Sequence, residues 1–315
     1  MLKIEAAIEI YLNARRVRIS EATTNLYRRC LLELSEFLGN PSITVVTIDD
    51  LRAYRASLLD QDTRWESHPM RPMENGGLSP STINKKIRVI KTFFKWLTDE
   101  ERLDKNPAYR LIPPDPVENP PKEISKENAL KMLCYAETQS SARDYAIFCF
   151  LANSTSRAYG VATLQIDHLY LERKSALIYY KGRNAQKQQR YVHYNQRTAR
   201  ALQTYLEQRG NNSYPELFIG CRGPLTTRGI YYVLDRIAAG AGVGDPHGPH
   251  SFRHAWAMNA FRAGADTATV QKVMGHRTPL TTIKHYSRWA EDELSERHEK
   301  FSWFPDEDEE IAEQN

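Results

Sequence analysis

The chain has 315 residues, 41% of them hydrophobic and 26% charged, which is typical of a globular protein with room for two domains. No run of 18 apolar residues occurs and acids interrupt the apolar part of the N-terminus, so we expect neither a membrane span nor a signal peptide. The net charge of +4 rises to +10 (43 basic residues against 33 acidic) without the last eleven residues, which hold six acids and no base, so the body suits either a polyanionic partner or a solvated surface.

The first third of the chain carries helical patterns with clear end signals. Residues 21–39 place apolar side chains at helical spacing and finish at Gly39, a residue type that favours the left-handed conformation found just after helices. Residues 47–61 begin with Thr47 and, three positions later, Asp50, which together can satisfy the free amide groups of a first helical turn. Both segments are therefore predicted as helices.

A third helix is predicted to follow a long loop. Residues 62–81 are rich in Pro, Gly and polar groups, which predicts the loop, and Ser79 followed by Pro80 is a typical helix start. An apolar stripe follows, made of Ile83, Ile87, Ile90, Phe94 and Leu97. A second, polar stripe consists of Asn84, Arg88, Lys91 and Lys95, with Lys85 nearby. Because no acid occurs between positions 79 and 98, this cationic face is predicted to bind a DNA backbone; the alternative is a solvated face.

A proline-rich segment divides the chain. Residues 113–122 contain five prolines, which fix φ and remove amide donors, so we expect a semi-rigid linker there. Residues 123–154 show helical patterns, residues 175–182 and 189–195 predict a β-hairpin, and helices return from position 225. The predicted fold class is mainly α with a small antiparallel β-sheet. The predicted organisation is a helical DNA-binding domain over 1–112, the linker over 113–122, a catalytic domain over 123–304 and an acidic tail over 305–315.

The segment HGPHSFRH, residues 247–254, places three histidines beside an arginine. A zinc site is disfavoured because no acid occurs between Asp245 and Asp266, and because an arginine repels a cation. The four cysteines form no CxxC pair, which argues against structural zinc and disulfides and suits a reducing cytoplasm. Arg253 can instead bind two phosphoryl oxygens, while His250 on the same helical turn donates to a third or moves a proton. A phosphodiester site without metal is therefore favoured.

The residues further along carry a resemblance to a known family. His276, in the sequence Met274–Gly275–His276, follows Arg253 by 23 positions, and Tyr286 follows His276 by ten. This order of HxxR, (L/M)GH and tyrosine resembles the catalytic half of the tyrosine recombinases, also called the phage integrase family. Residues 81–108 are similar to the last helix and exit turn of that family's core-binding domain. The resemblance implies an all-helical, SAM-like N-terminal core-binding domain and an α+β catalytic domain of the DNA breaking-rejoining type.

The family pattern also requires an arginine and a lysine upstream. Arg157, in NSTSRAYG, matches the arginine, and Lys181, 24 positions later in the predicted hairpin, matches the lysine. Gly160 departs from the pattern because the family usually has an acid there, which puts the support of Arg157 in question. Lys187 competes with Lys181 for the lysine's role.

The resemblance implies a site-specific DNA recombinase that cuts and rejoins strands without metal, ATP or any other cofactor. Tyr286 attacks phosphorus and forms a 3′-phosphotyrosine, which conserves the energy of the broken bond. Lys181 gives a proton to the leaving oxygen, and His250 accepts the phenolic proton. The implied catalytic residues are Arg157, Lys181, His250, Arg253, His276 and Tyr286. The implied partners are double-stranded recombination sites, further copies of the chain in a homotetramer on DNA, and accessory DNA-bending proteins.

Simpler explanations exist for each residue and for the whole protein. Arg157 can pair with a carboxylate such as Asp167, and Tyr286 can be an ordinary core aromatic. The competing functions are a type IB topoisomerase and a catalytically inactive DNA-binding protein. A trapped covalent protein–DNA adduct excludes the inactive protein, and joining of two different duplexes excludes the topoisomerase. We expect no catalytic role for the remaining histidines of the motifs, His247, His254 and His285.

Overall fold

The structure is a computed structural model that describes residues 1–64, 73–115, 122–181, 187–210, 213–286, 295, 298 and 299. The chain divides into two compact units, one extending to Asn119 and one formed by most of the chain from Pro120 onward. Helices dominate and the strands are short and antiparallel, so the predicted fold class is confirmed. None of the described helices is long and apolar enough to cross a membrane.

Helix ends in the first unit coincide with the predicted signals. Its described elements are α1 (Ile4–Arg15), α2 (Glu21–Leu38), a 3₁₀ turn (Ile43–Val45), α3 (Ile48–Leu59), β1 (Thr63–Arg64), β2 (Glu74–Asn75) and α4 (Pro80–Asp99). Gly39 ends α2 at a φ of +73°, in the left-handed region that glycine tolerates best. Thr47 and Asp50 form both hydrogen bonds of a capping box at the start of α3. The Ser79 hydroxyl accepts from the backbone N–H of Thr82 and starts α4.

The core of the first unit gathers around α4. All five members of the predicted apolar stripe are at most 1% exposed, and each such side chain contributes about 1.5–3 kcal/mol by its removal from water. The ring of Tyr11 in α1 packs edge-on against Phe93, with centroids 5.4 Å apart. Asn84 is also buried, at 7% exposure, and its Nδ2 donates to the carbonyl oxygen of Pro114 at 2.8 Å. Its predicted place on an exposed polar stripe is therefore wrong.

The predicted loop over residues 62–81 contains a short antiparallel ladder. Thr63 lies opposite Asn75, and Arg64 lies opposite Glu74. The backbone also approaches Gln61 closely at Gly77, where an added Cβ would lie 2.2 Å from a carbonyl oxygen. Two-residue strands have no room for an alternating pattern, which is why composition alone indicated a loop.

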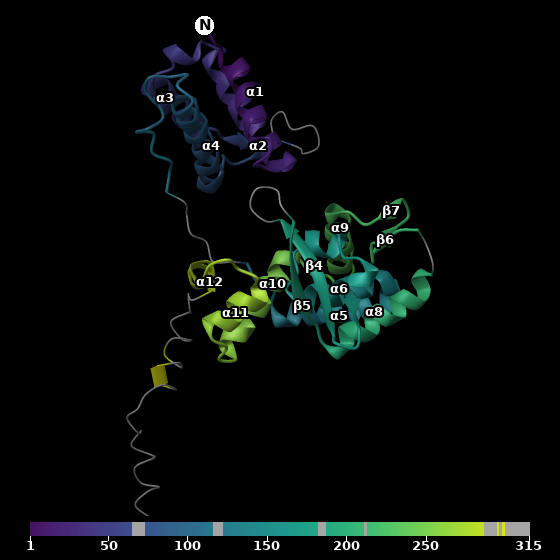
Figure 1. The fold of residues 1–315 in the computed structure, drawn as a ribbon. Helices are drawn as coiled ribbons and strands as arrows, with labels where there is room; N and C mark the ends of the chain where they lie inside the picture. Colours follow the sequence, from purple (N-terminus) through teal and green to yellow (C-terminus); the bar gives the residue numbers. More distant parts are fainter. Residues whose placement is uncertain are drawn as a thin grey trace, which may run out of the picture. The chain divides into compact units, whose positions relative to one another are not determined.

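The second unit is arranged around α6, which lies among α5, α8 and α10 (Figure 1). Its described helices are α5 (Lys126–Gln139), α6 (Ala142–Ser154), α7 (Ala158–Ala162), a 3₁₀ turn (Ile166–His168), α8 (Gln196–Arg209), α9 (Thr227–Gly240), α10 (Pro249–Arg262), α11 (Thr267–Met274) and α12 (Pro279–Tyr286). Ile147 and Phe150 of α6 are fully buried. An apolar helix surrounded in this way forms the rigid centre on which the surrounding loops are held.

The predicted hairpin is confirmed as part of a small sheet. The described strands are β3 (Leu169–Tyr170), β4 (Ser175–Lys181), β5 (Lys187–His193), β6 (Ile219–Gly220) and β7 (Gly223–Pro224). The first three form one sheet in the order β3–β4–β5, and the last two form a separate pair that the sequence did not indicate. Along and just beyond β5, Val192 and Tyr194 are buried while Tyr191 and His193 are exposed. This alternation places Arg190 on the same side as the core residues.

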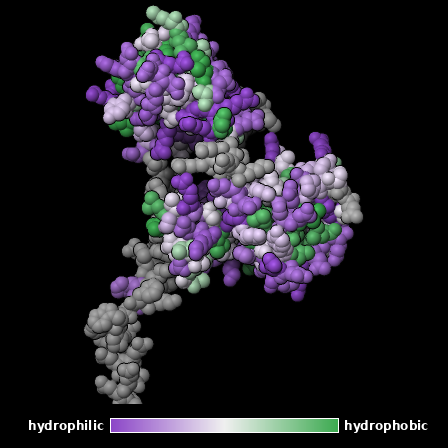
Figure 2. Space-filling view, in the orientation of Figure 1, coloured by the Kyte–Doolittle hydropathy of each residue, from purple (hydrophilic) through white to green (hydrophobic). Residues whose placement is uncertain are grey.

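Hydrophilic side chains cover most of the visible face of each unit, with scattered apolar areas between them (Figure 2). Several large apolar side chains nevertheless stand in solvent, including Tyr109, Ile112 and Leu280 at 70% exposure or more. Single exposed apolar residues are normal on globular proteins. The surface as a whole therefore gives no guide to the site, which has to be found from specific side chains.

Candidate active site

Arg157 stands at a sharp corner between two helices. Helix α6 ends at Ser154, and Thr155 then adopts a left-handed conformation with a φ of +54°. The Ser154 hydroxyl donates to the hydroxyl of Ser156 at 2.7 Å inside this buried corner. Arg157 is half-buried and precedes α7, and its carbonyl oxygen accepts from the backbone N–H of Val161 at 3.2 Å. Its guanidinium has no hydrogen bond and no ion pair among the described residues. The simpler explanation, an ion pair with Asp167, is therefore not what holds it.

Helix α10 presents His250 and Arg253 on one turn, as predicted. Pro249 occupies the first position of this helix, where its missing N–H costs nothing. Arg253 is 2% exposed and donates to the backbone carbonyl oxygens of Thr155 and Met274. Burial lowers the pKa of His250, and the positive charges of Arg157 and Arg253 lower that pKa further. The imidazole is therefore neutral at neutral pH and able to accept a proton.

His276 follows the end of α11 directly. Gly275 ends that helix at a φ of +62°, and the backbone N–H of His276 then donates to the carbonyl oxygen of Gln271 at 3.0 Å. Nδ1 of His276 forms a hydrogen bond with the buried Thr282 hydroxyl of α12, at 2.9 Å. Because α12 ends at Tyr286, this bond links the imidazole to the helix that carries the predicted nucleophile.

A single backbone oxygen joins these segments. The carbonyl oxygen of Thr155 accepts hydrogen bonds from Arg253 of α10 and from Arg190 of β5, the latter at 3.4 Å. The side-chain hydroxyl of Thr155 donates to the carbonyl oxygen of Val273 at 2.9 Å. The corner that precedes Arg157 and the turn that precedes His276 are therefore fixed to each other. We call this set, consisting of Thr155, Arg190, Arg253, Val273 and Met274, the arginine junction.

Arg190 is the residue that the sequence reasoning missed. Burial lowers the pKa of Arg190 to about 10, and the nearby charge of Arg157 contributes to the decrease. Its guanidinium donates to the carbonyl oxygens of Val273 and Thr155. The available signal was an arginine in strand register with the buried Val192, at a position where an apolar side chain is usual.

The structure places the backbones of the remaining predicted catalytic residues. Lys181 is the last residue of β4, its competitor Lys187 is the first residue of β5, and Tyr286 is the last residue of α12. Their side chains lie outside the described part of the structure. The positions of the lysine ammonium groups and of the phenol oxygen relative to Arg157 therefore remain predictions.

Gly160, where the family usually has an acid, packs tightly against the sheet. An added Cβ there would lie 3.2 Å from both the Cδ1 of Ile178 and the carbonyl oxygen of Tyr179. Contacts this short require strand β4 to move by a few tenths of an ångström. A side chain at this position therefore requires small shifts of its neighbours in β4. Arg157 has no acidic partner among the described residues.

The predicted cationic face of α4 is less uniform than its sequence indicated. Lys95 pairs with Asp99 at 2.8 Å, and both side chains are exposed. Lys91 is half-buried and donates to the carbonyl oxygens of Tyr109 and Leu111, at 3.1 and 2.6 Å. Lys85 and Arg88 are exposed, and neither forms an ion pair within the described residues.

His247, one of the two remaining histidines of the motif, lies close to two carboxylates. His247 lies in the loop before α10, as predicted, and its Nε2 is 3.1 Å from a carboxylate oxygen of Asp235 in α9. Its Nδ1 lies 3.2 Å from a carboxylate oxygen of Asp245. Within the described ranges, no group of three or more metal-ligating side chains lies together.

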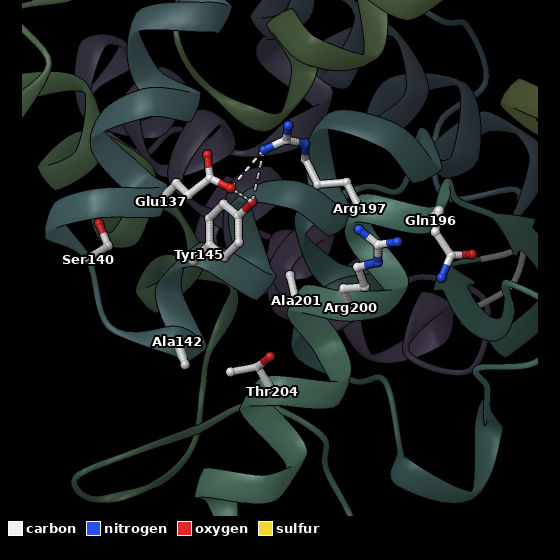
Figure 3. A pocket seen from close by; sticks show the side chains of 9 residues that line it. All are labelled: Glu137, Ser140, Ala142, Tyr145, Gln196, Arg197, Arg200, Ala201 and Thr204. Carbon is white, nitrogen blue, oxygen red and sulfur yellow. Dashed lines mark hydrogen bonds and ion pairs between the residues drawn. The ribbon is translucent and has the colours of Figure 1, made fainter.

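A separate cavity of about 640 Å³ opens between α5, α6 and α8 (Figure 3). It is lined by Glu137, Ser140, Ala142, Tyr145, Gln196, Arg197, Arg200, Ala201 and Thr204. Arg197 donates to Glu137 at 2.9 Å and to the hydroxyl of Tyr145 at 3.3 Å. None of the described catalytic candidates lines this cavity, so it is distinct from the arginine junction.

Solved structures share this architecture. A Tn1549 transposon integrase in complex with a circular intermediate DNA aligns with a TM-score of 0.75, covering 96% of this chain and 100% of that chain at 16% identity. A lambda integrase dimer bound to a core site aligns with a TM-score of 0.69, covering 92% and 99% at 11% identity. At such low identities these similarities establish the fold alone.

Sequence comparison gives the family. The chain is 28% identical over 291 residues to tyrosine recombinase XerC of Leptospira interrogans serovar copenhageni, covering 89% of this chain and 87% of that protein. It is 26% identical over 315 residues to tyrosine recombinase XerC of Oceanobacillus iheyensis, covering 95% and 97%. Residues 9–101 match the phage integrase N-terminal SAM-like domain, and residues 122–293 match the phage integrase family. Since that second match alone spans more than half of the sequence, the chain belongs to the phage integrase family, the tyrosine recombinases, whose activity is site-specific recombination.

Proposed function

We propose that the arginine junction and its neighbours form the site at which this recombinase breaks and rejoins a DNA strand, with Tyr286 as the nucleophile. The observation that carries the proposal is the state of Arg157. This half-buried guanidinium has no hydrogen-bond partner among the described residues, although the corner that bears it is fixed by several hydrogen bonds. A positioned but unpaired arginine is suited to bind the nonbridging oxygens of a phosphate.

The charges around Arg157 support a phosphodiester as the ligand. Burial lowers the pKa values of His250 and Arg190, and the charge of Arg157 lowers both further, so each of these groups lies within electrostatic reach of Arg157. Bringing such groups together is unfavourable without an anion. A phosphorane-like transition state carries more negative charge than the bound strand, and fixed cations therefore stabilise it preferentially.

The proposed first step is a balanced exchange at phosphorus. The Tyr286 oxygen forms a bond to phosphorus while the bond from phosphorus to the 5′-oxygen breaks, and the phenolic proton passes to the neutral imidazole of His250. Lys181 supplies a proton to the departing 5′-oxygen. The product is a 3′-phosphotyrosine with a free 5′-hydroxyl, and attack by the 5′-hydroxyl of a second strand reverses the chemistry.

The His276 side chain is proposed as a further donor to the nonbridging oxygens. Its Nδ1 forms a hydrogen bond with the hydroxyl of Thr282 in α12. Nε2, on the opposite edge of the ring, is therefore the atom proposed to donate to the phosphate. A hydrogen bond of this kind sets the orientation of the imidazole before DNA binds. Preorganised donors cost no reorganisation energy when the transition state forms.

We propose that the exposed cations of α4, Lys85 and Arg88 in particular, bind the phosphate backbone of the recombination site. Two relatives in the solved structures, the Tn1549 integrase and the lambda integrase, are themselves bound to DNA. We further propose that four copies of this chain act on two duplexes, with accessory DNA-bending proteins as further partners. Joining of two differently labelled duplexes tests this assembly.

Covalent trapping tests the proposed nucleophile. The probe is a pool of duplexes with random sequence, each nicked at a fixed position. In the members that are cleaved a few nucleotides from the nick, the short fragment carrying the 5′-hydroxyl diffuses away. The wild-type protein is expected to form an adduct stable to denaturant, and sequencing of the trapped DNA gives a defined substrate. Tyr286→Phe is expected to bind that substrate and form no adduct. A wild-type protein that binds duplexes and traps none of them contradicts the proposal.

A further inference from the structure

Arg190 occupies a costly position for an arginine. It is half-buried, and both burial and the charge of Arg157 disfavour its ionised form. Removing a charged group from water is unfavourable unless the group is hydrogen-bonded and paired. The acceptors found for its guanidinium are two backbone carbonyl oxygens, those of Val273 and Thr155. Because the surroundings of Arg190 disfavour its charge, the presence of an arginine here indicates a role that an uncharged side chain could not fill.

The two acceptors belong to the segments that carry catalytic candidates. Thr155 lies two positions before Arg157, and Val273 lies three positions before His276. Arg253 bridges the same pair of segments through the carbonyl oxygens of Thr155 and Met274. Two planar guanidinium groups, each with donors pointing in fixed directions, thus hold one corner against one turn. The Thr155 hydroxyl also donates to the carbonyl oxygen of Val273. The two guanidinium groups add directed hydrogen bonds to this contact and so restrict the relative orientation of the segments.

The absence of a side chain at Gly275 leaves room for the guanidinium of Arg190. A Cβ at this position would lie 2.9 Å from both Cδ and Nε of Arg190 and 3.0 Å from its Cζ. The φ of +62° separately disfavours any residue with a side chain. The glycine that precedes His276 therefore lets the guanidinium lie directly against the turn.

We propose that Arg190 is a positioning residue, which holds Arg157 and His276 at the spacing needed for both to reach one scissile phosphate. This inference rests on the proposed function, because it assigns the phosphate to the arginine junction. Arg190 acts through the two backbone segments. Lysine at this position supplies a point charge and cannot reproduce both directed hydrogen bonds.

The test compares Arg190→Met and Arg190→Lys with a matched control. Arg209, at the end of α8, also donates to backbone carbonyl oxygens, those of Tyr214, Glu216 and Leu217. Arg209→Met therefore removes a similar structural arginine from the same unit. The substrate is the nicked duplex recovered with the wild-type protein, and the measurements are its Kd, the single-turnover rate of adduct formation at saturating protein, and the melting temperature.

We expect Arg190→Met to form the adduct about 100-fold more slowly at saturation, with its Kd changed less than about threefold, because misplacement of catalytic groups by about 1 Å has effects of this size. Arg190→Lys is expected to recover only part of the rate. Arg209→Met is expected to lower the melting temperature and to keep the wild-type rate below that temperature.

A reciprocal change tests the contact with Gly275. Gly275→Ala alone is expected to slow adduct formation at least about tenfold, because its methyl group displaces the guanidinium. In the double variant with Arg190→Met the alanine is expected to add less than it does alone, since contacting residues give non-additive effects and only the backbone strain at position 275 remains.

Two results overturn the inference separately from the proposed function. If the wild-type protein forms the adduct and Arg190→Met does so at a rate within threefold of it, Arg190 has no positioning role. If Arg190→Met and Arg209→Met slow the reaction equally, the effect is one of general stability. A wild-type protein that forms no adduct overturns the proposed function and this inference together.

Discussion

The two groups of cations in this chain, on the exposed face of α4 and around the corner before α7, have the same sign of charge and different surroundings. On α4, Lys95 is paired with a carboxylate, and Lys91 is bonded to carbonyl oxygens of its own unit. Around the corner, Arg157 is half-buried and has no partner among the described residues. Counting positive residues therefore predicts a surface for DNA, while the partners of each side chain suggest which cations bind the backbone and which take part in the proposed chemistry.

The largest effect is expected from Arg157. Arg157→Met should slow adduct formation at saturating DNA by about 10²- to 10³-fold, because it removes a fixed donor from the developing charge on phosphorus. It should change the melting temperature little, since no described hydrogen bond is removed with it. Arg88→Met on α4 is the matched control, and it should weaken binding without changing the saturated rate. Equal effects of the two variants on the saturated rate would show that the cations of α4 and those around Arg157 do not differ in function.

The next largest effect is expected in the pH dependence of adduct formation, whose rate should change tenfold per pH unit through His250. Its pKa is lowered below the ordinary value of about 6.5, so the neutral, proton-accepting form persists to lower pH. Adduct formation at subsaturating DNA, which reports the free protein, should therefore be level near pH 7 and fall tenfold per unit below the lowered pKa. His250→Gln should remove this acidic limb. A limb centred above pH 6.5 would show that the imidazole is instead charged in the free protein.

The smallest effect is expected in the salt dependence of binding. Replacement of Lys85 and Arg88 together by alanine should reduce the slope of log Kd against log salt by about 1.8, which is about 0.9 for each phosphate that the protein no longer neutralises. Lys91→Met should leave that slope unchanged and lower the melting temperature, because its ammonium already binds Tyr109 and Leu111. Titrations at several salt concentrations measure both. A slope lowered by Lys91→Met would place its ammonium on the DNA.

The predictable features of this chain are those that depend on neighbouring positions. The capping pair Thr47 and Asp50, the glycine at the end of α2 and the apolar stripe of α4 are all set within a few residues, and each was found as predicted. The family resemblance likewise depends on residues in a fixed order. Their roles at the site stay predictions until they are tested with DNA.

The features that escaped prediction depend on contacts between distant segments. Arg190 binds a carbonyl oxygen 83 positions away, and Arg253 binds one 98 positions away. The register of QRYVHY places its arginine on the same side as Val192, but nothing in the local pattern indicates which oxygens receive its guanidinium. The same limit applies to Lys91, which binds the carbonyl oxygens of Tyr109 and Leu111. These residues follow α4 in the chain, and the sequence does not show that the chain turns back toward the lysine.

The use of a main-chain oxygen at Thr155 has a consequence for how this site tolerates change. Every amino acid carries the same carbonyl group, so replacement of the threonine cannot delete the acceptor shared by the two guanidinium groups. What a replacement can alter is the left-handed turn that aims this oxygen, together with the single hydroxyl bond to Val273. Asparagine and glycine, which adopt that turn readily, should therefore be mild exchanges, and β-branched valine, which keeps the bulk but not the hydroxyl, should be harsher than either.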